Sequence, residues 1–278
     1  MSAMLPGVYQ AEKKDGTVYY RSSITYKNKH ISLGSFADEE SAHRAYLLAG
    51  EVTSDASIAI EDYHRDHPLA FKKWVVLINY RDNDMYVKTP IYLKERFFYY
   101  YFAPEDYLIF DSDDLFYYST HSIMRRGGHL FVADFGMQVN ILSRYGIKNF
   151  AVPGRDYQFI NGNTTDFRSA NIKIINSYHG VLRIEAGAKD IFETKIHLNG
   201  DILVGRYDTE TEAAVAYNKA ADTLKALGVT KEFPENYILE LDSAGYKELY
   251  QQVKVRSKKL LRLGEAFLSE NGAKNTDR

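Results

Sequence analysis

Leu33-Gly34-Ser35-Phe36, followed by Ala42-x-x-Ala45-Tyr46-x-x-Ala49, is a pattern that this chain contains twice. It returns as Val204-Gly205-Arg206-Tyr207, followed by Ala213-x-x-Ala216-Tyr217-x-x-Ala220. Upstream of each stretch lie a Gly-Val pair, Gly7-Val8 or Gly180-Val181, and a matched segment, Tyr20–Ile24 or Phe192–Ile196. The offset between the copies drifts only from about 173 to about 171 residues, so loop changes of one or two residues align them. The chain therefore contains two copies of one module.

Each copy predicts three short strands followed by a helix. In the first copy, residues 7–12, 18–26 and 30–33 have strand character, and the turn signals Asp15-Gly16 and Lys27-Asn28 separate them. Asp38 is expected to cap the first helix, and Thr209-x-x-Glu212 has the form of a capping box for the second. The alanines and the tyrosine recur at helical spacing, which gives a small-residue face that can lie close on a sheet. We expect an α+β protein in which each module is a three-stranded antiparallel sheet covered by one helix.

The two copies resemble the plant Apetala-type (ethylene-response-factor) DNA-binding domain, which also occurs in bacterial and phage proteins. The matching features are the Gly-Val pair that opens the first strand, the isoleucine of the second strand, Leu-Gly-x-Phe, and the Ala-x-x-Ala-Tyr helix. The resemblance implies a sheet that lies in the major groove of DNA, with outward strand residues contacting bases and phosphates.

A second resemblance lies between the copies. Tyr157-Gln158-Phe159-Ile160-Asn161-Gly162-Asn163, followed by Asp166-Phe167-Arg168-Ser169-Ala170-Asn171-Ile172, resembles the C-terminal half of an HNH homing-type nuclease. In that family a metal-binding Asp stands where this chain has Gln158, and a His base stands where it has Phe159. Neither replacement can hold a divalent metal or activate water. We therefore expect no enzyme activity, no metal and no cofactor, with the surviving motif residues kept as a turn scaffold: Asn161, Asp166, Arg168 and Asn171.

The distribution of charge distinguishes the two copies. The whole chain has a net charge of −2, but residues 13–30 of the first copy carry several lysines and an arginine against Asp15 alone. If Ile24 and Leu33 face the helix, strand alternation places a polar set outward. The same alternation gives the second copy a mixed outer face, with Glu193, Lys195, His197, Asp201 and Leu203. The expected DNA-binding residues are Arg21, Ser23, Thr25, Lys27, Lys29 and His30 in the first copy, and Lys195 and Arg206 in the second.

The rest of the chain predicts a four-part organisation. Residues 80–118 are rich in Tyr and Phe but also acidic, which favours packing over contact with nucleic acid. Apolar residues past the second copy recur at near-helical spacing and predict an amphipathic helix, with a disordered tail from residue 269. The expected parts are a first Apetala-type module at 1–56, a Tyr-rich middle at 57–178 with a degenerate HNH-like segment at about 130–175, a second module at 179–237, and the C-terminal helix and tail at 238–278.

Other features exclude whole classes of protein. The chain has no cysteine, so it has no disulfide framework and no thiolate metal site. No signal peptide opens it, and no apolar run is long enough to span a membrane, so we expect no membrane association and a cytoplasmic location.

The function expected from these features is non-catalytic binding of double-stranded DNA, as by a transcriptional regulator derived from a mobile-element endonuclease in a bacterial or phage setting. The alternative is a protein-interaction or inhibitor role, in which the aromatic middle and the second module bind a protein partner or form a homodimer. A third reading is residual metal-dependent nuclease activity, which requires metal ligands from elsewhere in the chain.

Overall fold

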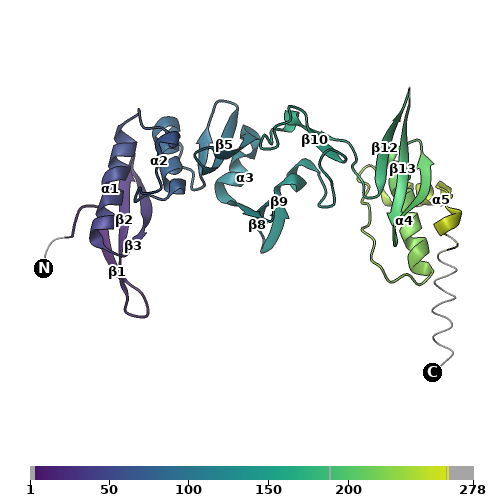
Figure 1. The fold of residues 1–278 in the computed structure, drawn as a ribbon, viewed down its shortest axis with the longest axis horizontal. Helices are drawn as coiled ribbons and strands as arrows, with labels where there is room; N and C mark the ends of the chain where they lie inside the picture. Colours follow the sequence, from purple (N-terminus) through teal and green to yellow (C-terminus); the bar gives the residue numbers. More distant parts are fainter. Residues whose placement is uncertain (1–3, 188, 261, 263–278) are drawn as a thin grey trace. The chain divides into compact units, whose positions relative to one another are not determined.

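The computed structural model describes residues 4–187, 189–260 and 262, and it confirms the expected α+β class (Figure 1). The chain divides into two compact units. The first contains the described residues up to Ile141 together with Asn161–Asn171. The second contains Leu142–Ile160 and the described residues from Ile172. The first module and most of the middle therefore share one unit.

The first module consists of β1 (Val8–Glu12), β2 (Val18–Tyr26), β3 (Lys29–Phe36) and α1 (Glu39–Ser54). The strands form an antiparallel sheet in the order β1-β2-β3, and α1 covers one face of it (Figure 1). Asp38 caps α1 as expected, because its carboxylate accepts the amide of Ser41 at 2.7 Å.

The Gly-Val pair and the helix tyrosine of the repeat belong to one contact. Gly7 has φ 75° and lies against the ring of Tyr46, so closely that a Cβ on Gly7 would stand 2.1 Å from Tyr46 Cδ2. The carbonyl of Gly7 also accepts the amide of Ser23 at 3.0 Å. Only glycine tolerates both the left-handed backbone and the ring contact.

The second module repeats this arrangement. It contains β12 (Val181–Ala186), β13 (Lys189–His197), β14 (Asp201–Tyr207) and α4 (Glu210–Ala226), with strand order β12-β13-β14. Gly180 has φ 72°, lies against Tyr217, and accepts the amide of Lys195 at 2.7 Å. The capping box of Thr209 and Glu212 is present. The internal repeat is thus a repeat of structure, down to the same backbone hydrogen bond.

A second helix packs against the helix of each module. In the first unit, α2 (Phe71–Asn83) packs on α1, and the shared core includes Ile31, Leu33 and Trp74. In the second unit, α5 (Ser243–Gln252) packs on α4. α4 is buried along most of its length, with Ala214 and Val215 at 0% exposure, in a core that also contains residues of the sheet and of the segment after α4.

The C-terminal helix that the apolar spacing predicts is interrupted: α5 ends at Gln252, and helical conformation returns at residues 258–260. After Gln252 the chain follows β14, an edge strand of its sheet. The amide of Arg256 donates to the carbonyl of Val204 at 3.1 Å, and Tyr207 donates to the carbonyl of Lys254 at 3.0 Å. The first of these contacts satisfies a carbonyl of the exposed sheet edge, which competes with continued helix. The predicted disordered tail lies outside the described residues.

The aromatic middle forms small sheets. β4 (Ile91–Leu93), β5 (Phe97–Ala103) and β6 (Asp106–Asp111) pair in that order. Alternation along β5 places Phe98 on a buried face, where its ring lies 5.4 Å from that of Phe110. Core packing by these aromatic residues agrees with the expectation. The remaining strands are β7 (Ile123–Arg126), β8 (His129–Asp134), β9 (Met137–Asn140), β10 (Tyr157–Phe159) and β11 (Ile172–Ile174), and the remaining helical turns are α3 (Leu115–Thr120), η1 (Ile60–Asp62), η2 (Ser112–Asp114), η3 (Ile141–Tyr145) and η4 (Ser169–Asn171).

Candidate nucleic-acid interface

The outer face of the β1-β2-β3 sheet is the face that α1 does not cover. Arg21 stands at its centre, on the middle strand, with Tyr9 and Ser35 as its cross-strand neighbours. Tyr9 is 58% exposed, and Arg21, Thr25 and His30 are exposed as well. Thr25 and His30 face each other across β2 and β3. By strand alternation this face carries no carboxylate among the described residues of the three strands.

Arg21 is oriented by a neighbour on its own strand. Its guanidinium donates two hydrogen bonds to the hydroxyl of Tyr19, at 3.2 and 2.7 Å, and it lies 5.4 Å from the centre of that ring. Because the acceptor is neutral, the full positive charge of Arg21 stays available to a phosphate. Sequence reasoning missed Tyr19, although its i,i+2 spacing from Arg21 places both side chains on one face.

The turn lysines are engaged elsewhere. Lys27 forms an ion pair with Asp84 and donates to the carbonyl of Arg81 at 3.1 Å, at the C-terminal end of α2. The carboxylate of Asp84 raises the pKa of Lys27. Lys29 lies with its ammonium 5.1 Å from the ring centre of Tyr86. Both lysines therefore join the β2-β3 turn to α2 and the segment after it, whereas Arg21 lies mid-sheet.

The expectation that Ser23 lies exposed on the outer face is wrong. Ser23 is only 8% exposed, and its hydroxyl has no hydrogen-bond partner among the described residues. Strand alternation does place Ser23 on the outer face. However, its short side chain lies on the central strand, between the longer side chains of Arg21 and Thr25. A register shift between Ser22 and Ser23 adds a bulge at this point. The glycine at position 34 inside β3 was the signal for that bulge.

In the second module the two expected DNA-binding residues bind a carboxylate of their own sheet. Lys195 pairs with Glu193 at 2.8 Å, and Arg206 pairs with the other oxygen of Glu193 at 2.9 Å. These two cations lower the pKa of Glu193. Glu193 was expected to be exposed and is 6% exposed, because the two long side chains cover it. His197 and Asp201 pair at 2.8 Å on the same face.

Apolar side chains occupy several of the remaining positions of that outer face. Ile184 is 37% exposed and Leu203 is 44% exposed. Leu203 faces Lys195 across the strands, and Leu182 faces Glu193. The equivalent faces of the two modules thus differ in chemistry. The first presents polar and basic groups that form no ion pair with one another in the described strands, and the second presents ion pairs and aliphatic groups.

The four residues that the HNH resemblance assigns to a scaffold form a hydrogen-bond network with one another. Asp166, 1% exposed, accepts from Arg168 at 2.9 and 2.7 Å and from the side-chain amide of Asn161 at 3.0 Å. Arg168 holds the pKa of Asp166 below its usual range. Asn171 accepts the backbone amide of Asn161 at 2.8 Å and donates to the carbonyl of Asp166 at 2.8 Å. This arrangement agrees with the expected scaffold role for all four residues.

The positions that depart from the HNH pattern lie on the short β10-β11 hairpin, where Gln158 pairs with Lys173 and Phe159 with Ile172. Within the part of the chain that the structure describes, no group of three or more His, Asp or Glu side chains is placed to hold a metal ion. No helix in the same part is long and apolar enough to cross a membrane.

Comparison of the chain with protein-family models, curated proteins and solved structures finds no match. The Apetala-type and HNH-type resemblances therefore stay predictions.

Proposed function

We propose that this protein binds double-stranded DNA without cleaving it, through the outer face of the β1-β2-β3 sheet. The observation that carries the proposal is the absence of carboxylates from this face combined with the exposure of Arg21, Thr25 and His30. Phosphate contacts provide most of the affinity of such interfaces, and a carboxylate among the contacts would repel the phosphates. The second module has Glu193 and Asp201 on the corresponding face and is assigned a smaller part in this binding.

The test is fluorescence anisotropy of the full chain with mixed-sequence duplex DNA, titrated across salt concentration without magnesium. We expect Arg21→Ala to weaken binding and to reduce the slope of log K against log salt by about 0.9, the value for one lost phosphate contact. The matched control is Arg44→Ala. Arg44 is also exposed but lies on α1, the helix that covers the opposite face. Equal losses in both variants would mean that only net charge matters, and unchanged binding in Arg21→Ala would refute the assignment.

The absence of catalysis is part of the same proposal. Asp166 and Arg168 bind each other, and Gln158 and Phe159 cannot activate water. Supercoiled plasmid incubated with the chain and magnesium or manganese should stay intact. If the plasmid is nicked, and the Asp166→Asn variant does not nick it, the protein is a metal-dependent nuclease and the proposal is wrong on this point.

A homodimer through the outer face of the second module is the second candidate. It is favoured by the exposed Ile184 and Leu203 beside ion pairs that already neutralise each other. Such a mixture of aliphatic groups and satisfied charges is typical of protein interfaces. Size-exclusion chromatography with light scattering should give a dimer that Leu203→Glu converts to a monomer. A monomeric wild-type chain would contradict this candidate.

A further inference from the structure

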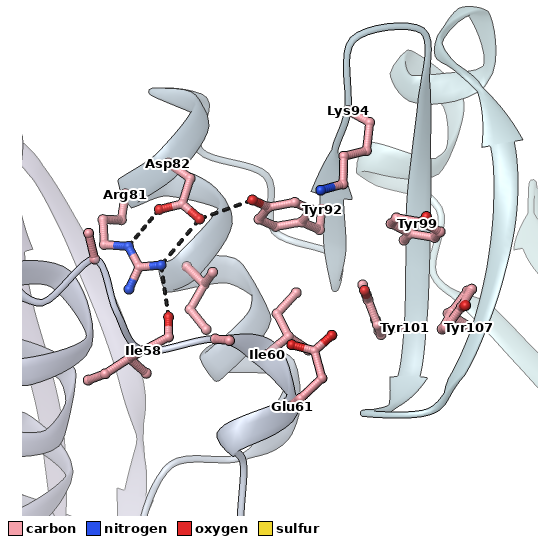
Figure 2. A pocket seen from close by; sticks show the side chains of 13 residues that line it. Ile58, Ile60, Glu61, Arg81, Asp82, Tyr92, Lys94, Tyr99, Tyr101 and Tyr107 are labelled. Atoms are coloured by element: carbon pink, nitrogen blue, oxygen red, sulfur yellow. Dashed lines mark hydrogen bonds and ion pairs between the residues drawn. The ribbon is translucent and has the colours of Figure 1, made fainter.

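A cavity of about 360 Å³ lies in the first unit, between η1, the C-terminal end of α2 and the β4-β5-β6 sheet (Figure 2). Four tyrosines form its wall on the side of the sheet. Tyr92 pairs with Tyr99 across β4 and β5, and Tyr101 pairs with Tyr107 across β5 and β6. The ring centres of Tyr99 and Tyr107 are 4.8 Å apart, and those of Tyr101 and Tyr107 are 5.3 Å apart. The strand alternation that buries Phe98 on the other face gathers these rings on this one.

The opposite wall is held in place by Arg81. Its guanidinium donates to the carbonyls of Val52, Asp55 and Ile58, at 3.0, 2.6 and 2.9 Å, and pairs with Asp82 at 2.6 Å. Its side chain is only 9% exposed. These contacts fix the chain that leads into η1 and use the charge of Arg81 within the fold. The wall is therefore formed before any ligand binds.

Asp82 is also engaged. In addition to Arg81 it accepts the hydroxyl of Tyr92 at 3.1 Å, as Figure 2 shows. The charged side chains of the lining that remain without an ion pair among the described residues are Glu61 and Lys94. The ammonium of Lys94 lies 4.8 Å from the ring centre of Tyr92. Glu61 lies at the opposite end of the cavity, next to Tyr101 (Figure 2).

Besides the cavity itself, the hydroxyl of Tyr101 indicates a bound ligand. Its side chain is 94% buried, being 6% exposed, and its hydroxyl has no hydrogen-bond partner among the described residues. Burial raises the pKa of Tyr101, so the hydroxyl stays protonated and can both donate and accept. The oxygen of this hydroxyl is not itself buried, so it is available to a bound group that completes its hydrogen bonds.

We propose that this cavity binds a guanidinium cation, as in arginine. The face of a tyrosine ring attracts a cation, and a flat guanidinium can lie on it. Its N–H groups match the acceptors at this end of the cavity, the carboxylate of Glu61 and the hydroxyl of Tyr101. A quaternary ammonium would leave those acceptors unused because it has no N–H group. A bare divalent cation requires several oxygen ligands, and the free carboxylate here is Glu61 alone.

The experiment is isothermal titration of the full chain with N-acetyl-L-arginine amide, and with N-acetyl-L-citrulline amide as the uncharged ligand of the same shape. We expect at least about tenfold tighter binding of the arginine compound. Glu61→Gln should weaken that binding at least about tenfold, whereas the matched control Lys94→Gln should not weaken it. Glu61 is exposed and has no ion pair among the described residues, so its replacement should leave the urea midpoint of Trp74 fluorescence unchanged.

Two results would overturn the proposal. One is equal binding, or no binding, of the two compounds to the wild-type chain, which does not depend on any variant. The other is a folded Glu61→Gln variant with unchanged affinity. Free L-arginine distinguishes the sources of the cation: tight binding assigns a free small molecule, and binding of the blocked compound alone assigns a peptide side chain. No DNA is present, so the outcome is independent of the proposed DNA binding.

Discussion

Replacement of Gly7 by alanine should destabilise the first unit far more than an ordinary surface substitution. Two separate effects add. The backbone of Gly7 has φ 75°, a left-handed conformation that costs a non-glycine residue about 1–2 kcal/mol. A Cβ at this position would also stand 2.1 Å from Cδ2 and 2.3 Å from Cγ of Tyr46, so the ring must move. Overpacking of this kind costs about 1–3 kcal/mol. The expected loss in free energy of unfolding is therefore about 2–5 kcal/mol.

The assay is urea unfolding followed by tryptophan fluorescence. Trp74 is the only tryptophan of the chain, and it is 2% exposed in the same core as Leu33 and Ala45 of the first module. Its emission therefore reports the unit that contains Gly7. With a urea dependence of about 2 kcal/mol per molar, the midpoint should fall by about 1–2.5 M.

Two further variants separate the two effects. Gly16 has φ 83°, but the nearest atom to an added Cβ is 3.8 Å away, so Gly16→Ala should lose only the backbone part, about 1–2 kcal/mol. Combining Gly7→Ala with Tyr46→Ala removes the two shortest contacts and leaves one of 2.9 Å to the Cβ of residue 46. The double variant should then be more stable than the sum of the single losses predicts, by about 1–3 kcal/mol. Additive losses within about 0.5 kcal/mol, or equal losses in Gly7→Ala and Gly16→Ala, would refute the reasoning.

Two smaller predictions use the same fluorescence assay. Ser22→Ala should leave the free energy of unfolding unchanged or slightly higher, because the buried hydroxyl of Ser22 has no hydrogen-bond partner among the described residues; a loss above about 1 kcal/mol would contradict this. Asp166→Asn should destabilise the first unit by about 1.5–3 kcal/mol at neutral pH, because Arg168 loses a charged acceptor. Since the folded pKa of Asp166 is lowered, its contribution is present above the unfolded value of about 3.9 and is lost as the pH falls through the folded value. The variant and the wild-type chain should therefore converge in stability once the pH falls below the folded pKa of Asp166, and a difference that persists in strong acid would argue against the charge as its origin.

The candidate interface was only partly predictable from the sequence. Strand alternation correctly predicted that Arg21, Thr25 and His30 are exposed, because the two-residue period of side-chain direction is a property of the strand backbone. It failed for Ser23, whose neighbours cover it, and it could not show that Lys27 binds Asp84, which lies far along the chain. Ion pairs between distant residues depend on which surfaces the core packing brings together.

The sequence by itself determined the repeated module, because the glycine, alanines and tyrosine at matching positions produce the same local packing of helix on sheet in both copies. It also determined the α+β class, since strand and helix periods are written in the order of the residues. The tertiary structure decided what each copy presents outward. Glu193 lies between Lys195 and Arg206 only when β13 and β14 pair, and the tyrosine cavity exists only when the β4-β5-β6 sheet meets the segment fixed by Arg81. Such sites join residues that are distant in sequence, and no local sequence pattern predicts that these residues come into contact.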